Sequence, residues 1–193
     1  MKLKLITAPN VEPMTLTEAK LFLRVDGITE NDLITELITI AREYCENYQN
    51  RAYITQTWEL ALDCFPAVDY IELPKGKLQS VTSVKYYDTT ETETTFSSDN
   101  YHVDDYNVVG KVVLAYSEIW PTTTLRTTNG VIIRYVVGYG DNASDVSVRV
   151  KQAMYMLIAH WYENREATGQ RFVPKEIDFA VSALLTQDRI VRF

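Results

Sequence analysis

The sequence predicts an α+β protein: a small helical bundle formed by N- and C-terminal helices, with an inserted antiparallel β-sheet or small sandwich. Apolar residues recur at steps of three and four before about residue 50 and again after residue 146, which indicates helices. Between them, β-branched and aromatic runs alternate with Thr-rich connectors and no helical pattern intervenes, which indicates antiparallel strands. The expected domains are a helical core of residues 1–52 and 146–193, and an inserted β domain of residues 53–145.

Two helices are expected in the first block. Thr15 and Glu18 fit a capping box, in which the Thr15 hydroxyl accepts from the Glu18 amide and the Glu18 carboxylate reaches back. The helix that begins there is expected to stop at Asp26–Gly27. A second helix opens within residues 29–32, and its apolar stripe continues to Tyr48.

The middle block carries the expected strands. Their residues are β-branched or aromatic, and the Thr-rich segments 89–95 and 122–128 are expected to connect them. Asn129–Gly130 is a turn signal before the last strand. The strand segments are Trp58–Leu62, Ile71–Pro74, Val81–Tyr87, Tyr101–Val103, Val112–Tyr116 and Val131–Val137.

Two further helices are expected after the β block. An apolar stripe runs from Val146 to Trp161 over about four turns. Gly169 breaks it, and Pro174 suits the first position of a last helix, where an amide proton would have no partner within the helix. The apolar face of that helix runs from Ile177 to Leu185.

Composition excludes several classes of protein. The chain has 193 residues, of which 46% are hydrophobic and 23% charged, as in an ordinary globular protein. We expect no targeting signal and no membrane span, because the longest uncharged helical stretch, Gln152–Tyr162, is far shorter than the ~20 residues that a bilayer requires. Cys45 and Cys64 are expected to be free, buried and inert thiols in a reducing cytosol.

Charge is unevenly distributed along the chain. There are 19 basic and 26 acidic residues, a net charge of −7. Residues 53–145 hold 6 basic and 13 acidic groups, whereas residues 146–193 hold 7 and 5. The acidic β block would repel nucleic-acid phosphates. The basic end could meet an acidic partner, or it could simply be a solvated helix face.

No constellation of residues supports catalysis, a cofactor or a metal. The two histidines are His102 and His160, and a pair of His102 with Asp104 on one strand face lacks a third ligand. Asp104 and Asp105 point to opposite faces of a regular strand, so they make a poor acid–base pair. Gly138–Asp141 lacks the Lys-Ser/Thr of a phosphate loop and indicates a backbone turn.

Tyrosines are numerous in the β block, and three interpretations stay open for them. They could form the core or cross-strand pairs, contribute to a protein interface, or provide a platform for a small ligand or glycan. A ligand- or glycan-binding module is therefore the alternative function, and an enzyme of unrecognised type is a third. The residues concerned are Tyr86, Tyr87, Tyr101, Tyr106, Tyr116, Tyr135 and Tyr139.

Short landmarks follow one another in a specific order. They are Leu16–Lys20, Ala41–Glu46, Tyr53–Trp58, Ile71–Pro74, Ser80–Asp88, Trp120–Pro121, Val136–Gly140, Trp161–Glu166, and Ala183–Leu185 in the helix after Pro174. In this order the chain resembles the tailed-bacteriophage head–tail connector (adaptor) family, the group similar to the HK97 connector and the phiE125 gp8-type phage proteins. The resemblance covers nearly the whole chain. The simplest relatives are all-helical, so the β insertion is a departure from them.

The resemblance implies a structural virion protein of a phage or prophage, with no enzymatic activity and no cofactor. It implies a homo-oligomeric ring beneath the portal, assembled in the host bacterial cytoplasm, although the isolated chain could be a monomer. The implied partners are the portal protein and a tail-completion or tail protein. DNA would pass through the ring without specific binding, and no membrane is involved.

The resemblance also places the portal contact at the C-terminus, with Arg189, Arg192 and Phe193 as candidates. From the sequence itself, Arg165 and Glu166 at the end of the third helix are expected to pair locally or across subunits.

Overall fold

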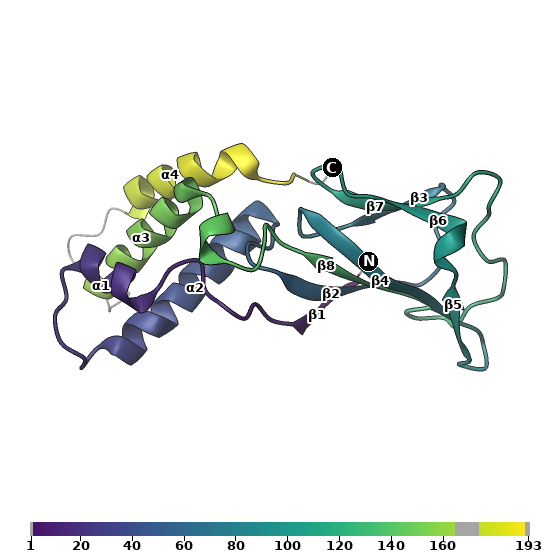
Figure 1. Cartoon of the computed structure of the whole chain (residues 1–193), viewed down its shortest axis with the longest axis horizontal. Helices are drawn as coiled ribbons and strands as arrows, with labels where there is room; N and C mark the ends of the chain where they lie inside the picture. Colours follow the sequence, from purple (N-terminus) through teal and green to yellow (C-terminus); the bar gives the residue numbers. More distant parts are fainter. Residues whose placement is uncertain (1, 165–173, 192–193) are drawn as a thin grey trace. The chain divides into compact units, whose positions relative to one another are not determined.

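A computed structural model describes residues 2–164 and 174–191, and for residues 174–178 it describes the backbone only. The chain divides into two compact units (Figure 1). The β unit comprises residues 1–9 and 55–139, and the helical unit comprises residues 10–54 and 140–193. The first nine residues, which the sequence analysis grouped with the helices, therefore belong to the β unit.

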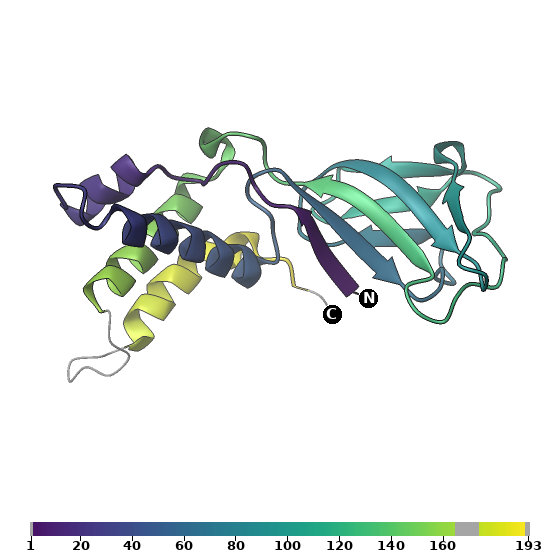
Figure 2. The ribbon, with the colours of Figure 1, turned by 90° about the horizontal axis from the view of Figure 1, so that it is seen from below.

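The β unit is built from two antiparallel sheets that lie as two layers (Figure 2). One sheet has five strands in the order β1-β2-β8-β4-β5, and the other has three in the order β3-β7-β6. The strands of the first are β1 Lys2–Thr7, β2 Gln56–Leu62, β8 Val131–Val137, β4 Leu78–Tyr87 and β5 Glu93–Phe96. Those of the second are β3 Tyr70–Leu73, β7 Gly110–Leu114 and β6 Tyr101–Asp104. The α+β class and the antiparallel pairing are as expected.

Alternation along the strands builds the core between the sheets. In β8, Ile133 and Tyr135 are fully buried while the intervening Arg134 is exposed. Ile133 lies opposite Leu60 of β2 on one side and Val84 of β4 on the other. Burying an aliphatic side chain of this size contributes about 1.5–3 kcal/mol, so this central ladder supplies much of the stability of the β unit.

The two layers approach closely at a glycine. A Cβ atom on Gly110 of β7 would lie 2.4 Å from the Cβ atom of Leu78 in β4, which belongs to the other sheet. Only glycine leaves room for this approach.

The expected strands are present, and the two edge strands β1 and β5 are additions. Strand β1 was missed although Lys2, Leu3, Lys4 and Leu5 alternate between charged and apolar residues, because an alternation of only four residues is a weak strand signal. Strand β5 overlaps the Thr-rich segment 89–95 that was expected to be a connector, and its one buried residue, Phe96, follows that segment.

The helical unit contains α1 Leu16–Leu23, α2 Asn31–Gln49, α3 Val148–Glu163 and α4 Pro174–Leu185. The capping box is confirmed: the Glu18 amide donates to Thr15 Oγ1 at 3.2 Å, and the Thr15 amide donates to Glu18 Oε2 at 2.7 Å. These hydrogen bonds lower the pKa of Glu18. Helix α1 ends slightly earlier than expected, because Arg24 already adopts a left-handed conformation with φ of 56°. Helix α4 begins at Pro174 as predicted.

Helices α2, α3 and α4 pack through their apolar stripes, and α1 contacts both α2 and α3. Ile34 and Ile38 of α2 are buried, as are Met154 and Leu157 of α3. Phe22 of α1 stacks on Tyr155 of α3 with ring centroids 4.8 Å apart. No helix in the described part of the chain has the length and apolar character needed to span a membrane.

Candidate assembly surfaces

A buried amide ties the end of α4 to the end of α2. The Gln49 side chain is fully buried, and its Nε2 donates to the Leu185 carbonyl oxygen at 2.6 Å. Its Oε1 accepts from the Tyr53 hydroxyl at 2.7 Å. Because both polar ends of the Gln49 side chain are satisfied inside the unit, the exit point of the chain from α4 is fixed.

The segment that follows α4, residues 186–191, is then held against the end of α2. The Ile190 amide donates to the Gln49 carbonyl at 2.9 Å, and Asn50 Nδ2 donates to the Ile190 carbonyl at 2.9 Å. Arg51 Nε donates to the Asp188 carbonyl oxygen. The Ile190 side chain is 7% exposed. We call this the docked C-terminal segment.

Arg189 is displayed on the outside of the docked C-terminal segment. Its guanidinium lies 4.8 Å from the centre of the Tyr48 ring, a cation–π contact, and the residue is exposed. The neighbouring Asp188 pairs with Arg149 of α3 at 2.9 Å. Of the interface residues expected from the sequence, Arg189 alone falls within the described residues. The others, Arg165, Glu166, Arg192 and Phe193, lie outside them.

A buried charge cluster supports the same end of α2. Arg42 is 6% exposed; its Nε donates to Glu12 at 2.8 Å and its Nη1 to Glu46 at 2.9 Å. Glu46 also accepts from the Tyr53 amide at 2.8 Å. Burial opposes the charge on Arg42, but Glu12 and Glu46 outweigh it and the pKa of Arg42 is raised. This cluster was not predicted from the sequence, although Arg42 and Glu46 stand one helical turn apart on the buried face of α2.

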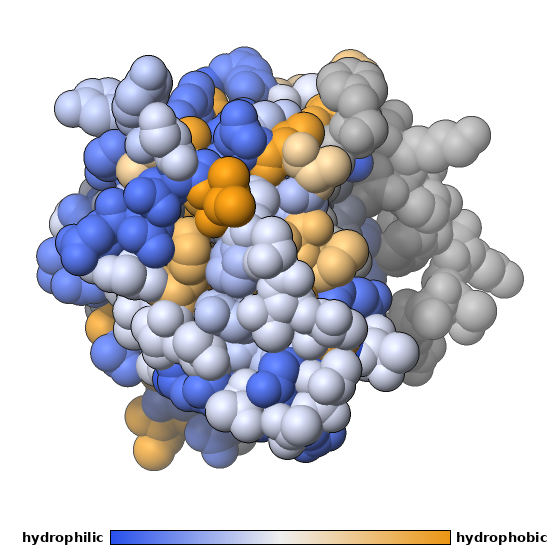
Figure 3. Space-filling view, turned by 90° about the vertical axis from the view of Figure 1, so that its right-hand side faces the viewer, coloured by the Kyte–Doolittle hydropathy of each residue, from blue (hydrophilic) through white to orange (hydrophobic). Residues whose placement is uncertain are grey.

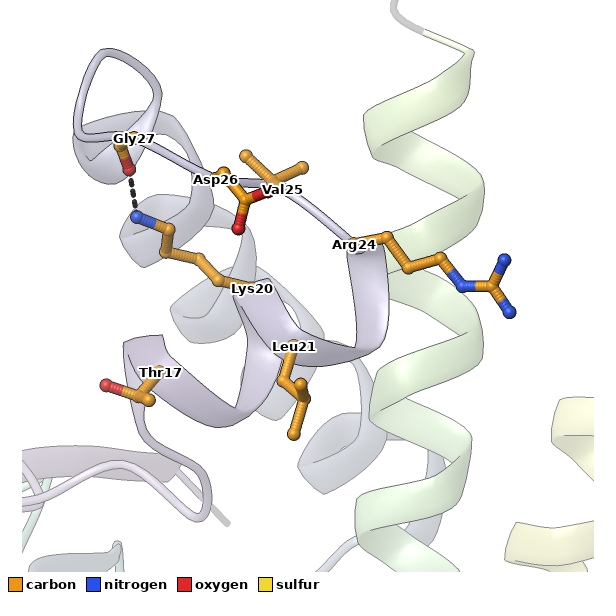
Figure 4. Close-up of a pocket in the computed structure, with 7 residues that line it drawn as sticks. All are labelled: Thr17, Lys20, Leu21, Arg24, Val25, Asp26 and Gly27. Atoms are coloured by element: carbon orange, nitrogen blue, oxygen red, sulfur yellow. Dashed lines mark hydrogen bonds between the residues drawn. The ribbon is translucent and has the colours of Figure 1, made fainter.

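A depression of about 510 Å³ lies at the α1–α2 corner (Figure 4). Lys20 donates to the Gly27 carbonyl and, at 2.9 Å, to Asn31 Oδ1. Figure 4 shows the Arg24 side chain pointing away from that of Lys20, so the two cations do not converge on one ligand. Leu21 and Ile28, 80% and 81% exposed, make this corner an apolar prominence. The lining residues are Thr17, Lys20, Leu21, Arg24, Val25, Asp26 and Gly27.

One end of the β unit is acidic. This is the end at which β4 turns into β5, and Figure 3 views it face on as a largely hydrophilic surface with separate apolar areas. Among the described residues, several carboxylates here take part in no ion pair within 4.0 Å. They are Asp69, Asp88, Glu91, Asp99 and Glu118. This end would therefore repel an anionic partner.

Aromatic rings close the sandwich beneath that acidic end. Phe65 stacks on Trp120 with centroids 5.2 Å apart and meets Tyr86 at 5.9 Å, and Phe96 stacks on Tyr101 at 6.0 Å. The Trp120 indole donates to the Val68 carbonyl at 2.8 Å. These rings pack against one another and act as core.

The tyrosines divide between core and surface. Tyr135 and Tyr101 are buried, whereas Tyr106 and Tyr116 are 99% and 97% exposed. Tyr106 precedes β7 and Tyr116 follows it, so the two lie towards opposite ends of one strand and form no shared platform. A cavity of about 440 Å³ near Cys64 has Phe65 as its one aromatic lining residue. The geometry thus gives no support to a glycan platform in the described residues.

The cysteines differ in burial. Cys45 is fully buried, and burial raises its pKa to about 12. Cys64 is exposed, so the expectation that both thiols are buried was wrong for this residue. It lies in the connection after β2, where the strand alternation that would have buried it has ended.

This difference predicts selective labelling. In the folded protein at pH 8, a thiol-reactive dye is expected to modify Cys64 at least 100-fold faster than Cys45, because the thiolate is the reactive form and Cys45 holds its proton. Mass spectrometry of the labelled peptides measures this ratio. Denaturant should equalise the two rates, and equal rates without it would contradict the burial of Cys45.

The remaining polar candidates form no metal or catalytic group in the described part of the chain. His102 and Asp104 share strand β6, but no group of three or more metal-ligating side chains occurs among the described residues. His160 lies in the last turn of α3, beside Asn164. Gly138 follows β8 with φ of 140°, so Gly138–Asp141 is a backbone turn, as expected.

Comparison with known proteins points to one family. A family model described as "head completion protein" matches residues 12–180. A solved structure titled "Neck of empty GTA particle computed with C6 symmetry" contains a chain 23% identical, with a TM-score of 0.82, covering 100% of this chain and 97% of that one. A chain from "Virion of native gene transfer agent (GTA) particle" has the same identity and coverage, with a TM-score of 0.81. No curated protein matches.

Proposed function

This chain belongs to the head completion protein family, and we propose that copies of it form a closed ring in the virion, between the portal and the tail of a phage-type particle. Its role is structural, at the connection of head and tail. The family match over residues 12–180 carries this proposal. The similar chain in a particle neck computed with C12 symmetry, with a TM-score of 0.77, supports the ring.

The surfaces of the chain suit this role. A ring repeats one heterologous interface, so each copy needs two different complementary patches, and further surfaces for the portal and the tail. The docked C-terminal segment supports a portal contact, because it presents Arg189 from a fixed backbone. Asp188 of the same segment pairs with Arg149 of α3 at 2.9 Å, which also holds the segment in place.

The acidic β unit suits a DNA conduit. Residues 53–145 carry 6 basic and 13 acidic groups, and the unpaired carboxylates at the β4–β5 end are open to solvent. If this surface lines the channel, it repels the DNA phosphates and lets DNA pass without binding. A lumen lined with lysine and arginine in an assembled ring would contradict this arrangement.

Assembly with the portal tests the proposed function. The purified chain is mixed with the portal ring from the same genome, and its native mass is measured across a concentration series with electron-microscope images of the same samples. Closed rings, alone or captured on the portal, are expected. A chain that stays monomeric and unbound at every portal concentration would contradict the proposal.

Arg165→Glu is expected to weaken ring assembly at least tenfold while the melting temperature stays within about 2 °C of wild type. The sequence predicts that Arg165 forms an ion pair, and an ion pair of this kind contributes little to folding, whereas the reversed charge would give a like-charge contact repeated around the ring. Sedimentation and circular dichroism measure the two quantities. Unchanged assembly would show that Arg165 is only solvated.

A further inference from the structure

Strand β1 is an open, apolar edge of the five-stranded sheet. It is hydrogen-bonded to β2 alone among the described strands, and all six of its residues are exposed. Leu3, Leu5 and Ile6 are 37%, 42% and 37% exposed. An apolar edge strand is a template for pairing with another chain. Lys4 lies between Leu3 and Leu5 and is exposed, whereas Lys2 already pairs with Asp63 at 3.3 Å, so a partner strand with a carboxylate near Lys4 would suit this edge best.

Strand β5 is the other edge of the same sheet, and its charge is opposite. It pairs with β4 alone among the described strands, and Glu93, Thr94 and Thr95 are all exposed. Glu91, in the turn that leads into β5, is also exposed and forms no ion pair in the described part of the chain. One edge of the sheet thus ends in lysines and the other in glutamates.

The outer face of the sheet continues this charge pattern across its width. Lys4 lies opposite Glu59 of β2, and Glu59 in turn binds Arg134 of β8 at 2.6 Å. Lys85 of β4 binds Glu93 of β5 at 2.5 Å. Opposite charges therefore already stabilise neighbouring strands within the sheet, and a Lys4–Glu93 neighbour would extend the same pattern.

The inner face matches as well. Leu3 lies opposite the fully buried Leu60, which places Leu3 and Leu5 on the inner face of β1. Phe96 lies opposite the fully buried Val84, which places Phe96 and Thr94 on the inner face of β5. Joining β1 to β5 therefore keeps uncharged side chains together on the inner face and charged side chains together on the outer face.

We propose that β1 of one copy pairs with β5 of the next, so that one sheet continues from subunit to subunit. This rests on the proposed ring and names its interface. The pairing is heterologous, as a ring requires. Pairing of two β1 strands would oppose lysines, and pairing of two β5 strands would oppose glutamates. All four strand pairs of the sheet are antiparallel, so β1 and β5 run in the same direction and pair in parallel across the interface.

Cysteine cross-linking tests this interface. In a Cys64→Ser background, Leu5→Cys is combined with Thr94→Cys on the same inner face or, as the matched control, with Thr95→Cys on the opposite face. All three substituted positions are exposed, so the fold is expected to persist. After mild oxidation of the full chain with its portal, the Leu5/Thr94 pair should give a ladder of covalent multimers on a non-reducing gel. The Leu5/Thr95 pair should give at most one tenth as much.

The same variants, kept reduced, are also measured for native mass and imaged by electron microscopy. These measurements report whether rings form at all, and so they separate the proposed ring from the proposed β1–β5 interface. Rings without a ladder would place the subunit interface elsewhere and overturn the β1–β5 pairing, while the ring would stand. A dimer from Leu5→Cys alone would show that two β1 strands meet, which also overturns it. Absence of both rings and ladder would overturn the two proposals together.

Discussion

Arg42→Met is expected to lower the free energy of unfolding by about 3–5 kcal/mol, because it leaves the buried carboxylate of Glu46 and the half-buried carboxylate of Glu12 without their shared cation. Glu46 is 7% exposed and cannot recover solvation without opening the unit. Glu12 would lose its partner at 2.8 Å. Urea unfolding followed by far-ultraviolet circular dichroism measures the loss.

Glu43→Gln is the matched control for Arg42→Met. Glu43 also faces Arg42, but at 3.7 Å and with a side chain that is 60% exposed, so its removal should cost less than about 1 kcal/mol. A loss for Arg42→Met no larger than that of the control would show that the cluster contributes no more than a surface ion pair. Arg42→Met should also weaken capture of the chain by the portal, because the cluster supports the end of α2 that holds the docked C-terminal segment.

Periodicity predicted the parts of the fold that have one buried face. Helix α1 with its Thr15–Glu18 box, helix α4 from Pro174 and the alternating strand β8 all follow local rules, and each is present. Strands β1 and β5 were missed because each carries only a short signal: the Lys–Leu alternation of β1 covers four residues, and β5 lies mostly in a Thr-rich run with Phe96 as its one buried residue.

The candidate site was less predictable, because it depends on residues distant in the sequence. The hydrogen bond of Gln49 to Leu185 spans 136 positions, and that of Asn50 to Ile190 spans 140. No local pattern reports such a contact. The resemblance to head–tail connectors pointed to the C-terminus, and the structure adds how Arg189 is held there.

Ile190→Asp is expected to release the docked C-terminal segment and to reduce capture by the portal at least tenfold. Ile190 is 7% exposed, and its backbone amide and carbonyl are both bonded to the end of α2. A carboxylate at this position would have to be buried or would carry the segment into solvent. The second outcome costs less, so the helices should stay folded while Arg189 loses its fixed position over Tyr48.

Val191→Asp provides the comparison that separates position from charge. Val191 is the next residue and is 58% exposed, so the same carboxylate there leaves the segment docked. Portal capture within threefold of wild type is expected for Val191→Asp. Equal losses for both variants would show that the portal contact responds to negative charge alone, and no loss for either would place the contact outside residues 186–191. If portal capture falls for Ile190→Asp alone, the portal contact requires the docked backbone. The two variants carry the same added charge, and they differ only in that Ile190 is buried and Val191 is exposed.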